Sequence, residues 1–381
     1  MQRGRVVALI DGAAVVRTQR AAVTVADPPA SWRVGMFVDV TTREVIGGGE
    51  HLPTSASEVM RLTPARIAHL EVRARVLTSL RGFFAARGFL EVETPLIVPS
   101  PGLEIHLDAV AAGDGYLITS PEYAMKRLLA GGLEKIFQVC KCFRANEHGP
   151  HHAGEFTMIE WYRAFDTIES IARDTEELVH AVCGDHAQLG ERRIAVTPPW
   201  ARLTVRDALG KWAGVHVAGD ESAAELTAAV RAAGIEIADG LAWDDAFFTA
   251  WLARVEPALA ELDHAILIED WPAPLAALAR RKEGDPRTAL RFEAYVGGLE
   301  LANAFDELVD AGEQEQRFRE EQQVRRDRGR PVYPIDGKLI AALHEGLPPS
   351  GGIALGFDRL VMLATGATTI GDVQALAEAE R

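Results

Sequence analysis

The chain has 381 residues, 48% of them hydrophobic, and carries a formal net charge of −15. This length predicts two or three domains with large buried cores. The acidic net charge argues against a protein whose whole surface binds nucleic acid electrostatically, but it is compatible with a local basic patch. Three cysteines without a further Cys or His pair predict reduced core thiols, not a disulfide framework or a zinc site. No apolar stretch reaches ~18 residues, so we expect a cytoplasmic protein with no membrane-spanning segment.

The beginning of the chain differs from the rest in composition. Residues 4–46 alternate short Val-rich runs with turn signals, which predicts a small antiparallel β unit of about four strands at 1–46. The segment 47–60 is rich in Gly and Ser and has the composition of a linker. We expect the remainder, 61–381, to form one large α+β domain.

The first half of this domain alternates helix and strand signals. Thr63 and Pro64 predict the start of a helix that ends at Gly88, and Ser120-Pro121-Glu122 predicts the start of a second helix that ends at Gly131-Gly132. Strands are predicted over 89–93, 135–144 and 155–165. One face of the last strand carries a carboxylate within an apolar and aromatic row, which is typical of a ligand pocket, and consists of Phe156, Met158, Glu160 and Tyr162.

The second half contains fewer signals. Residues 170–290 are Ala-rich and helical with short strands, and they contain no functional motif. Asp310–Arg328 predicts a helix with an acidic start and a basic end, whose charges we interpret as a solvated face. Ser350 begins a Gly-rich strand that leads into a helix over 357–364, with Gly366 as its C-cap.

A hairpin carries the most informative pair of side chains. Gly297-Gly298 predicts a two-residue turn that sets Tyr295 opposite Glu300, with Glu293 as a diagonal neighbour on the same face. Two carboxylates this close favour a divalent cation between them, and oxygen ligands favour magnesium or calcium. The alternative is an exposed hairpin with two solvated acids.

Glycines and arginines supply a second, weaker signal. The glycines at 351, 352 and 356 allow a close approach of backbone to ligand, and Arg359 on the following helix adds a permanent cation. Arg144 ends the strand that precedes the loop to Glu155. The spacing fits neither a P-loop nor a dinucleotide-binding fold.

Three ordered motifs resemble those of class II aminoacyl-tRNA synthetases. They are Arg87 to Pro95, Phe143-Arg144 with the loop to Glu155-Phe156-Thr-Met, and Gly352 to Arg359, and the resemblance covers about 60–381. Further segments are similar to the lysine branch, namely Thr119 to Tyr123, Glu155 to Tyr162 and Glu300 to Glu307. The resemblance implies a mostly antiparallel sheet flanked by helices, an enzyme that uses ATP and Mg²⁺, and a homodimer.

Within that branch the chain resembles the elongation factor P β-lysine ligases, which are paralogues of lysyl-tRNA synthetases. Only about 60 residues precede the catalytic region, too few for a full anticodon-binding barrel of roughly 100 residues. Ala354 occupies a position where lysyl-tRNA synthetases have glycine, and Trp161-Tyr162-Arg163 and Leu301-Ala302-Asn303 are similar to the ligase branch. The resemblance implies activation of (R)-β-lysine, or lysine, and transfer to a lysine of elongation factor P.

The resemblance also implies roles for individual residues at the nucleotide. Arg144 would hold the amino acid carboxylate and the α-phosphate, Arg359 the γ-phosphate, and Glu293 and Glu300 the magnesium ion. Phe156 would stack on adenine. The remaining ATP contacts would come from Asn146, Glu147, His152, Leu301 and Gly356.

For the amino acid, the resemblance places Ser120 and Glu122 near the amino group next to the carboxylate. The side-chain end would be lined by Glu160, Tyr162, Asn303, Phe305, Glu307 and Ala354. Structural alternatives are a helix N-cap for Ser120, a dipole-compensating role for Glu122, plain core for Phe156 and a loop position for His152.

The chain departs from its relatives at two points. Arg144-Ala-Asn-Glu147 replaces Arg-Asn-Glu, so Glu147 is the alternative to residue 146 as the adenine-reading group, and Ala153 removes an amide. In addition, Glu300 and the odd-numbered Asn303, Phe305 and Glu307 share one pocket only if a bulge or twist occurs near Ala302.

Two other functions remain open from the sequence. A lysyl-tRNA synthetase with a reduced N-terminal domain would share the adenylation chemistry and use tRNA as acceptor. A non-catalytic paralogue would sense an amino acid or bind tRNA, but it would need neither both arginines nor the paired glutamates.

Overall fold

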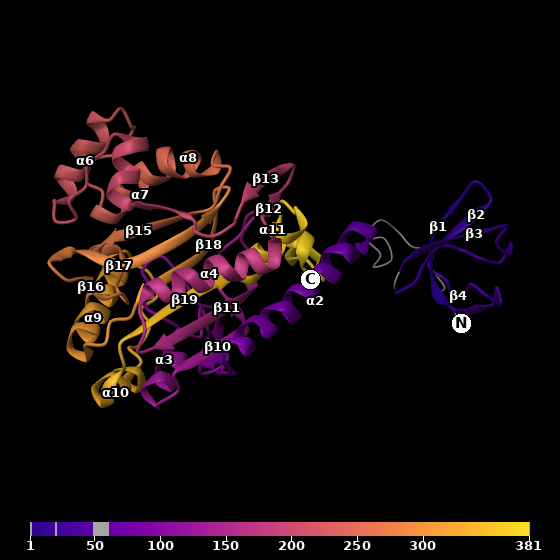
Figure 1. Cartoon of the computed structure of the whole chain (residues 1–381), viewed down its shortest axis with the longest axis horizontal. Helices are drawn as coiled ribbons and strands as arrows, with labels where there is room; N and C mark the ends of the chain where they lie inside the picture. The colour runs from indigo at the N-terminus through magenta and orange to yellow at the C-terminus, as the bar shows by residue number, and fades with distance from the viewer. Residues whose placement is uncertain (1, 20, 49–60, 381) are drawn as a thin grey trace. The chain divides into compact units, whose positions relative to one another are not determined.

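The computed structural model describes residues 2–19, 21–48 and 61–380, which form two compact units, Met1–Glu71 and Val72–Arg381 (Figure 1). Most of the predicted linker at 47–60 lies outside the described residues. We keep 1–46 and 61–381 as proposed domain bounds. No helix of the described part is long and apolar enough to cross a membrane.

The N-terminal unit contains a five-stranded antiparallel sheet where the sequence predicted about four strands. Its strands run in the order β3-β2-β1-β4-β5. They are β1 (Arg3–Ile10), β2 (Ala13–Arg17), β3 (Ala22–Ala26), β4 (Phe37–Asp39) and β5 (Val45–Gly47). Alternate residues of the strands, together with Trp32, form a small core of Val6, Ala14, Val16, Val25 and Val38.

The larger unit is built on a nine-stranded, mostly antiparallel sheet, as predicted for an α+β class. The order is β14-β15-β17-β18-β19-β11-β10-β6, and β16 pairs with β17. The strands are β6 (Leu90–Glu91), β10 (Lys135–Phe143), β11 (Glu155–Ala164), β14 (Ala201–Thr204), β15 (Ile266–Pro272), β16 (Arg281–Lys282), β17 (Asp285–Val296), β18 (Leu299–Asp306) and β19 (Ser350–Gly356). Small sheets lie outside it, made of β7 (Ile97–Val98), β8 (Ala111–Ala112), β9 (Gly115–Leu117), and of β12 (His186–Leu189) with β13 (Arg192–Ala195).

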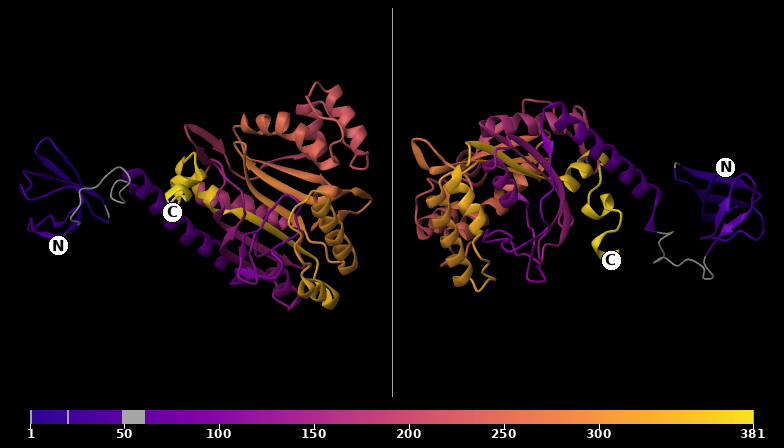
Figure 2. Two further views of the ribbon diagram at one scale, coloured as in Figure 1. Left: turned by 180° about the vertical axis from the view of Figure 1, so that it is seen from behind. Right: turned by 90° about the horizontal axis from the view of Figure 1, so that it is seen from below.

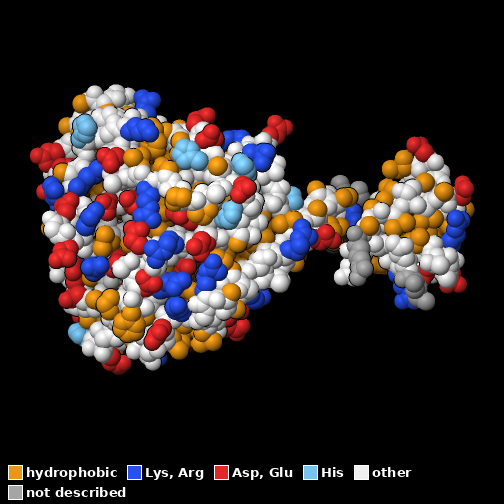
Figure 3. All heavy atoms as spheres, viewed as in Figure 1, with side chains coloured by type: hydrophobic (Ala, Val, Ile, Leu, Met, Phe, Trp, Pro, Cys, Tyr) orange, Lys and Arg blue, Asp and Glu red, His pale blue; other side chains and the backbone are white. Residues whose placement is uncertain are grey.

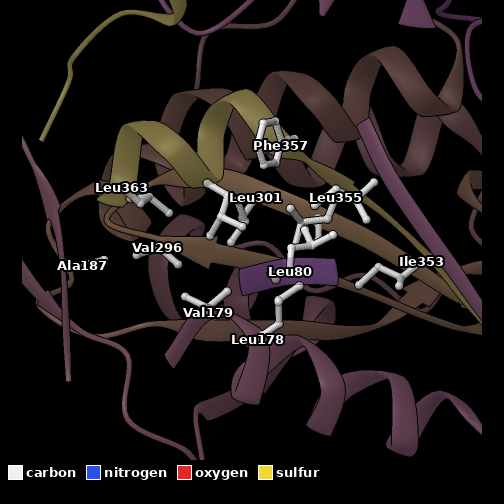
Figure 4. Packing of buried hydrophobic residues seen from close by; sticks show 14 of the residues in the cluster. Leu80, Leu178, Val179, Ala187, Val296, Leu301, Ile353, Leu355, Phe357 and Leu363 are labelled. Carbon is white, nitrogen blue, oxygen red and sulfur yellow. The ribbon is translucent and has the colours of Figure 1, made fainter. Parts of the chain in front are cut away.

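One face of the sheet packs against three helices and forms the main core. The helices are α2 (Pro64–Ala86), α4 (Ile168–Cys183) and α11 (Phe357–Thr365). Figure 4 shows their apolar side chains directed at the sheet, with Leu80, Leu178, Val179, Phe357 and Leu363 facing Leu301, Ile353 and Leu355. Because side chains alternate along a strand, the residues between these core positions point to the opposite face.

A second set of helices packs at the β14–β15 edge of the sheet (Figures 1 and 2). It consists of α5 (Val205–Ala208), η1 (Leu209–Ala213), α6 (Ala223–Ala232), α7 (Trp243–Ala250), η2 (Trp251–Val255) and α8 (Glu256–Ala260). These helices have their own core, in which Phe247 stacks on Trp243 and Trp251. The helices between residues 205 and 260 of the Ala-rich segment therefore form a separate structural layer, whereas α4 and β15 of the same segment belong to the main core and the central sheet.

The remaining helices are α3 (Glu122–Ala130), α9 (Ala311–Asp327) and α10 (Gly337–Gly346), with short 3₁₀ turns η3 (Ala273–Leu275), η4 (Ile370–Val373) and η5 (Glu378–Glu380).

Several predicted boundaries are confirmed. The Arg66 N–H donates to Thr63 Oγ1 at 3.1 Å at the start of α2, and Gly366 is the left-handed C-cap of α11. The strand predicted over 89–93 is reduced to two residues.

The thiols lie in the larger unit. Cys142 is buried and Cys140 is half-buried on the same face of β10, with their sulfur atoms 3.9 Å apart. Burial raises the pKa of the Cys183 thiol to about 12. All three cysteines are free, as the sequence predicted.

The interpretation of the α9 charges as a solvated face is wrong for Arg317 and Arg325, although Arg319 and Arg326 are exposed. Arg325 is fully buried and Arg317 is 8% exposed. Arg325 donates to the carbonyl oxygens of Pro331, Glu104 and Leu107 at 2.6, 2.8 and 2.9 Å and pairs with Asp108 Oδ1 at 2.6 Å. The basic end of the helix therefore anchors the 104–108 loop, which composition alone could not indicate.

We expect Arg325→Leu to lower the free energy of unfolding by about 3 to 5 kcal/mol, because it leaves Asp108 and buried carbonyl groups without their cation. Arg326→Leu on the exposed side of the same turn should change it by less than about 0.5 kcal/mol. Urea denaturation measures both variants. Equal effects would show that Arg325 contributes no more than a surface arginine.

Candidate active site

The larger unit contains a cavity of about 970 Å³ on the sheet face opposite the main core. It is lined by β11, β17, β18, β19, helix α9 and the loop at 104–107. Of the residues predicted to bind ATP, substrate or metal, all but Asn146 line it. They are Ser120, Glu122, Arg144, Glu147, His152, Phe156, Glu160, Tyr162, Glu293, Glu300, Leu301, Asn303, Phe305, Glu307, Ala354, Gly356 and Arg359.

Asn146 is exposed and does not line the cavity. Its φ of 62° lies in the left-handed region, which asparagine tolerates better than most residues. Nothing in the structure supports a nucleotide contact for it. Glu147, the alternative named from the sequence, does line the cavity and lies 3.6 Å from Arg144.

The hairpin between β17 and β18 forms with Tyr295 opposite Glu300, as predicted. The register then shifts, so that Ala294 pairs with Ala302 and Leu301 is an extra residue. The bulge turns Leu301 toward the main core and brings Glu300 to the same cavity as Asn303 and the residues that follow. The bulge predicted near Ala302 is thus confirmed.

The two hairpin glutamates have different environments. Glu293 is 6% exposed, contacts the Arg291 guanidinium and accepts a hydrogen bond from the Tyr295 hydroxyl at 2.5 Å. Burial raises the pKa of Glu293 to about 7, and the charge of Glu300 adds to this shift. Glu300 is half-buried and lies 3.8 Å from Arg359 Nη1. The alternative of two solvated acids is therefore wrong for Glu293.

A metal site is not evident from protein ligands alone. The described residues contain no group of three or more His, Cys, Asp or Glu side chains placed to hold a metal ion. Magnesium bound with a nucleotide needs only one or two carboxylates, because phosphate oxygens and water complete its shell. Glu293 and Glu300 are the hairpin carboxylates that line the cavity.

The two predicted arginines border the same part of the cavity. Arg144 lies over the Phe156 ring at 5.0 Å from its centroid. Arg359 contacts the Glu300 carbonyl oxygen and lies 2.9 Å, through Nη2, from His152 Nε2. Burial, and then the charge of Arg359, lower the pKa of His152, which favours a neutral imidazole that can accept from the guanidinium.

An ion pair that the sequence did not reveal fixes the start of α11. Asp358 pairs with Arg73 Nη1 at 2.5 Å and accepts the Thr157 N–H at 2.6 Å. Arg73 also donates to Thr157 Oγ1 at 2.9 Å. Since Asp358 precedes Arg359, this network on α2, β11 and α11 holds the backbone that presents the arginine.

The other part of the cavity contains buried carboxylates. Glu160 is 1% exposed and accepts hydrogen bonds from Ser120 Oγ at 2.5 Å and from the Tyr162 hydroxyl at 3.0 Å. Burial raises the pKa of Glu160 well above its usual range, and Glu122 adds to the shift. Ser120 Oγ also accepts the Glu122 N–H at 3.0 Å, so it orients the helix start as well as Glu160.

Glu307 completes this group. It is 1% exposed, and burial raises the pKa of its carboxyl to about 8. Gly352 on β19 faces it closely, because a Cβ there would lie 2.2 Å from Glu307 Oε1 and 2.3 Å from the Tyr162 ring. The glycine of the third motif is thus required for the two side chains to occupy their positions.

Comparison with known proteins agrees with this geometry. A sequence model of the family described as tRNA synthetases class II (D, K and N) matches residues 57–380. The chain belongs to this family. This class II synthetase homologue is 39% identical over 329 residues to the elongation factor P–(R)-β-lysine ligase of Enterobacter sp. (strain 638), covering 82% of this chain and 95% of the relative. Ligases of the same name from Salmonella paratyphi A (strain ATCC 9150 / SARB42) and Salmonella heidelberg (strain SL476) match with the same identity and coverage.

Family membership confirms the predicted class of enzyme. The synthetase homologue is an aminoacyl ligase, and ligases of this class use ATP. The non-catalytic alternative is therefore not favoured. The β1–β5 sheet precedes the residues that the family model matches.

Sequence reasoning missed several charged residues that line the cavity or contact residues that line it. Arg291 contacts Glu293, and the loop and helix residues Glu104 and Glu321 lie at the cavity wall. Lys126 pairs with Glu122 and Glu307. Of these residues, only the contact of Lys126 with Glu122 could have been predicted from the sequence, because Lys126 follows Glu122 by four residues on a predicted helix and so lies on the same helix face.

Burial raises the pKa of Glu160 and Glu307 in the folded protein. We therefore expect the free energy of unfolding of the unliganded synthetase homologue to fall as pH rises above about 4.3, the ordinary pKa of a glutamate side chain. A raised carboxyl pKa means that the folded protein holds a proton which the unfolded chain has already released. Glu160→Gln should reduce this fall, and Glu155→Gln at the start of the same strand should not. Thermal melting between pH 5 and pH 8 measures the effect. Parallel curves for wild type and Glu160→Gln would contradict it.

Proposed function

We propose that this protein activates (R)-β-lysine, or lysine, with ATP and transfers it to a lysine side chain of elongation factor P. The observation that carries the proposal is the arrangement along β11. Phe156, with Arg144 over its ring, and Glu160 lie on one face of the strand, four residues or about 13 Å apart. This spacing fits a molecule with an adenylate at one end and an ammonium group at the other.

In the first step, an oxygen of the amino acid carboxylate attacks the α-phosphorus of ATP, and pyrophosphate leaves. Arg144 would hold the two anions together, since a planar guanidinium can contact both. Its Nη1 lies 3.6 Å from Glu147, whereas its buried Nε has no hydrogen-bond partner among the described residues and is free to donate to an anion. Positioning and charge neutralisation supply most of the acceleration in such transfers.

The triphosphate would extend toward Arg359 and His152. Glu300 and Glu293 would hold a magnesium ion, which neutralises phosphate charge when it is bound. Glu300 is the more available of the two, because Arg291 and Tyr295 already contact Glu293. Phe156 would stack on adenine, with Glu147, Leu301 and Gly356 beside the nucleotide.

The ammonium groups of the amino acid would enter the carboxylate group around Glu122, Glu160 and Glu307. A charged amine that loses its water requires a carboxylate as replacement, and each of these three acids is buried. Tyr162, Asn303, Phe305 and Ala354 would form the walls, and Ser120 would contact the amine near the carboxylate.

In the second step, the acceptor amine attacks the activated carbonyl carbon and AMP leaves. A protein acceptor is supported by the relatives, whose names include elongation factor P. On the face shown in Figure 3, acidic and basic side chains are interspersed over the larger unit, which does not resemble an extended tRNA-binding surface. A homodimer and a cytoplasmic location belong to the same proposal.

Pyrophosphate exchange tests the first step, and transfer to purified elongation factor P or to lysine tRNA tests the second. We expect exchange with (R)-β-lysine to exceed exchange with α-lysine, and labelled product to appear on the protein. Arg144→Ala should abolish exchange, while Arg326→Leu on the exposed face of α9 should retain it. Preference for α-lysine together with charging of tRNA would instead identify a lysyl-tRNA synthetase.

Ala354 provides a test of the amino acid preference. It lies opposite Glu160 on one neighbouring strand and Asn303 on the other, so its methyl group is part of the cavity wall. Ala354→Gly should shift the preference toward α-lysine by about 1 to 3 kcal/mol. Ala304→Gly, which faces the main core from β18, should lower stability without changing the preference. An unchanged ratio in Ala354→Gly would show that this methyl group does not select.

A further inference from the structure

Lys126 is a buried cation that the proposed reaction does not use. It lies on α3 and is 1% exposed. Its Nζ lies 2.6 Å from Glu122 Oε1 and 2.6 Å from Glu307 Oε2. The ammonium group of a protein side chain therefore occupies a position between two of the carboxylates that would receive the substrate.

The ion pairs connect parts of the chain that are distant in sequence. Glu122 belongs to the same helix as Lys126, whereas Glu307 follows β18. Glu307 uses Oε2 for the lysine, and its Oε1 has no hydrogen-bond partner within the described part of the chain. The lysine thus fixes the separation of the two carboxylates, while Oε1 of Glu307 is buried beside Gly352 with its hydrogen-bond position unfilled.

The charges of the groups around Lys126 are complementary to those of a diamino acid. In the empty cavity burial raises the pKa of Glu160 and Glu307, but a bound diamino acid would favour their ionised forms; Glu122, Glu160 and Glu307 then contribute −3 and Lys126 contributes +1, so the group carries −2. Glu104 and Arg144 also act on this group with opposite charges, and Glu321 is a further acid near Glu104 and Glu122. A diamino acid brings two ammonium groups, which match this charge, while its carboxylate goes to the Arg144 end.

We propose that Lys126 is a positioning residue that sets the amino acid specificity of this site. By holding Glu122 and Glu307 at a fixed separation, and by leaving a charge of −2, it makes the cavity selective for an amino acid with two ammonium groups at a defined spacing. This inference rests on the proposed function, since it assumes that the cavity binds a diamino acid.

Removal of the side chain should create an empty ammonium position. Lys126→Ala leaves three buried carboxylates without their internal cation and opens a space of about the size of the lost butylammonium chain. A small alkylammonium ion could then enter and restore the charge. A role in packing alone would be restored equally well by a neutral molecule of similar size.

The test compares Lys126→Ala with wild type in pyrophosphate exchange. We expect the KM for the amino acid to rise by about tenfold or more, and the KM for ATP to change by less than about threefold. Propylammonium chloride should lower the amino acid KM of the variant again, and propanol should not. Lys141→Ala is the matched control, because Lys141 pairs with Glu155 at 3.2 Å on a half-exposed part of β10. It should resemble wild type and show no response to the amine.

Thermal melting gives a second measurement that does not require activity. Propylammonium should raise the melting temperature of Lys126→Ala more than propanol does, and it should not raise that of wild type. If Lys126→Ala does not fold, Lys126→Arg decides, because a wider cation should raise the amino acid KM while the KM for ATP is retained.

The inference is overturned if the amino acid KM of the folded variant is unchanged, if both KM values rise together without a response to the amine, or if propanol restores the variant as well as propylammonium does. A wild type that exchanges with no diamino acid contradicts the proposed function. In that case the melting experiment still decides whether Lys126 fills an ammonium position.

Discussion

Burying several carboxylates in one cavity requires that each of them finds a cation or a hydrogen-bond donor. Much of the larger unit follows from this constraint. Glu160 depends on Ser120 and Tyr162, Glu293 on Arg291 and Tyr295, and Glu307 on a lysine from a separate helix. Glu293 finds its partners on its own strand β17, but α3, β11 and the end of β18 must come together before Glu160 and Glu307 can leave water at an acceptable cost.

The alternation of side chains along the strands makes the arrangement compatible with a stable core. Ile159 and Trp161 on β11, and Ile353 and Leu355 on β19, pack against α2, α4 and α11, while the residues between them face the cavity. Burial of apolar side chains on one face of the sheet thus stabilises the strands that position the polar side chains on the other face. The bulge at Leu301 interrupts this alternation, since it gives that residue to the core and returns Glu300 to the cavity side.

Several predictions from the sequence depended only on local patterns, and these agree with the structure. The cap at Thr63, the Gly297-Gly298 turn and the mixed face of β11 each follow from steric preferences or side-chain period over a few residues. The need for a bulge near Ala302 could also be deduced, because the parity of Glu300 and Asn303 is incompatible with a regular strand.

The sequence by itself determined the family, the strands of the cavity and nearly all of the predicted residues that line it, because these are properties of motifs and of strand alternation. Only the tertiary structure decided which charges are buried together. Arg325 on α9 and Lys126 on α3 resemble ordinary surface cations in the sequence, yet each is paired with an acid brought from a distant segment. A charged side chain has no intrinsic preference for one partner over another, so its burial depends on contacts that exist only after the chain has folded.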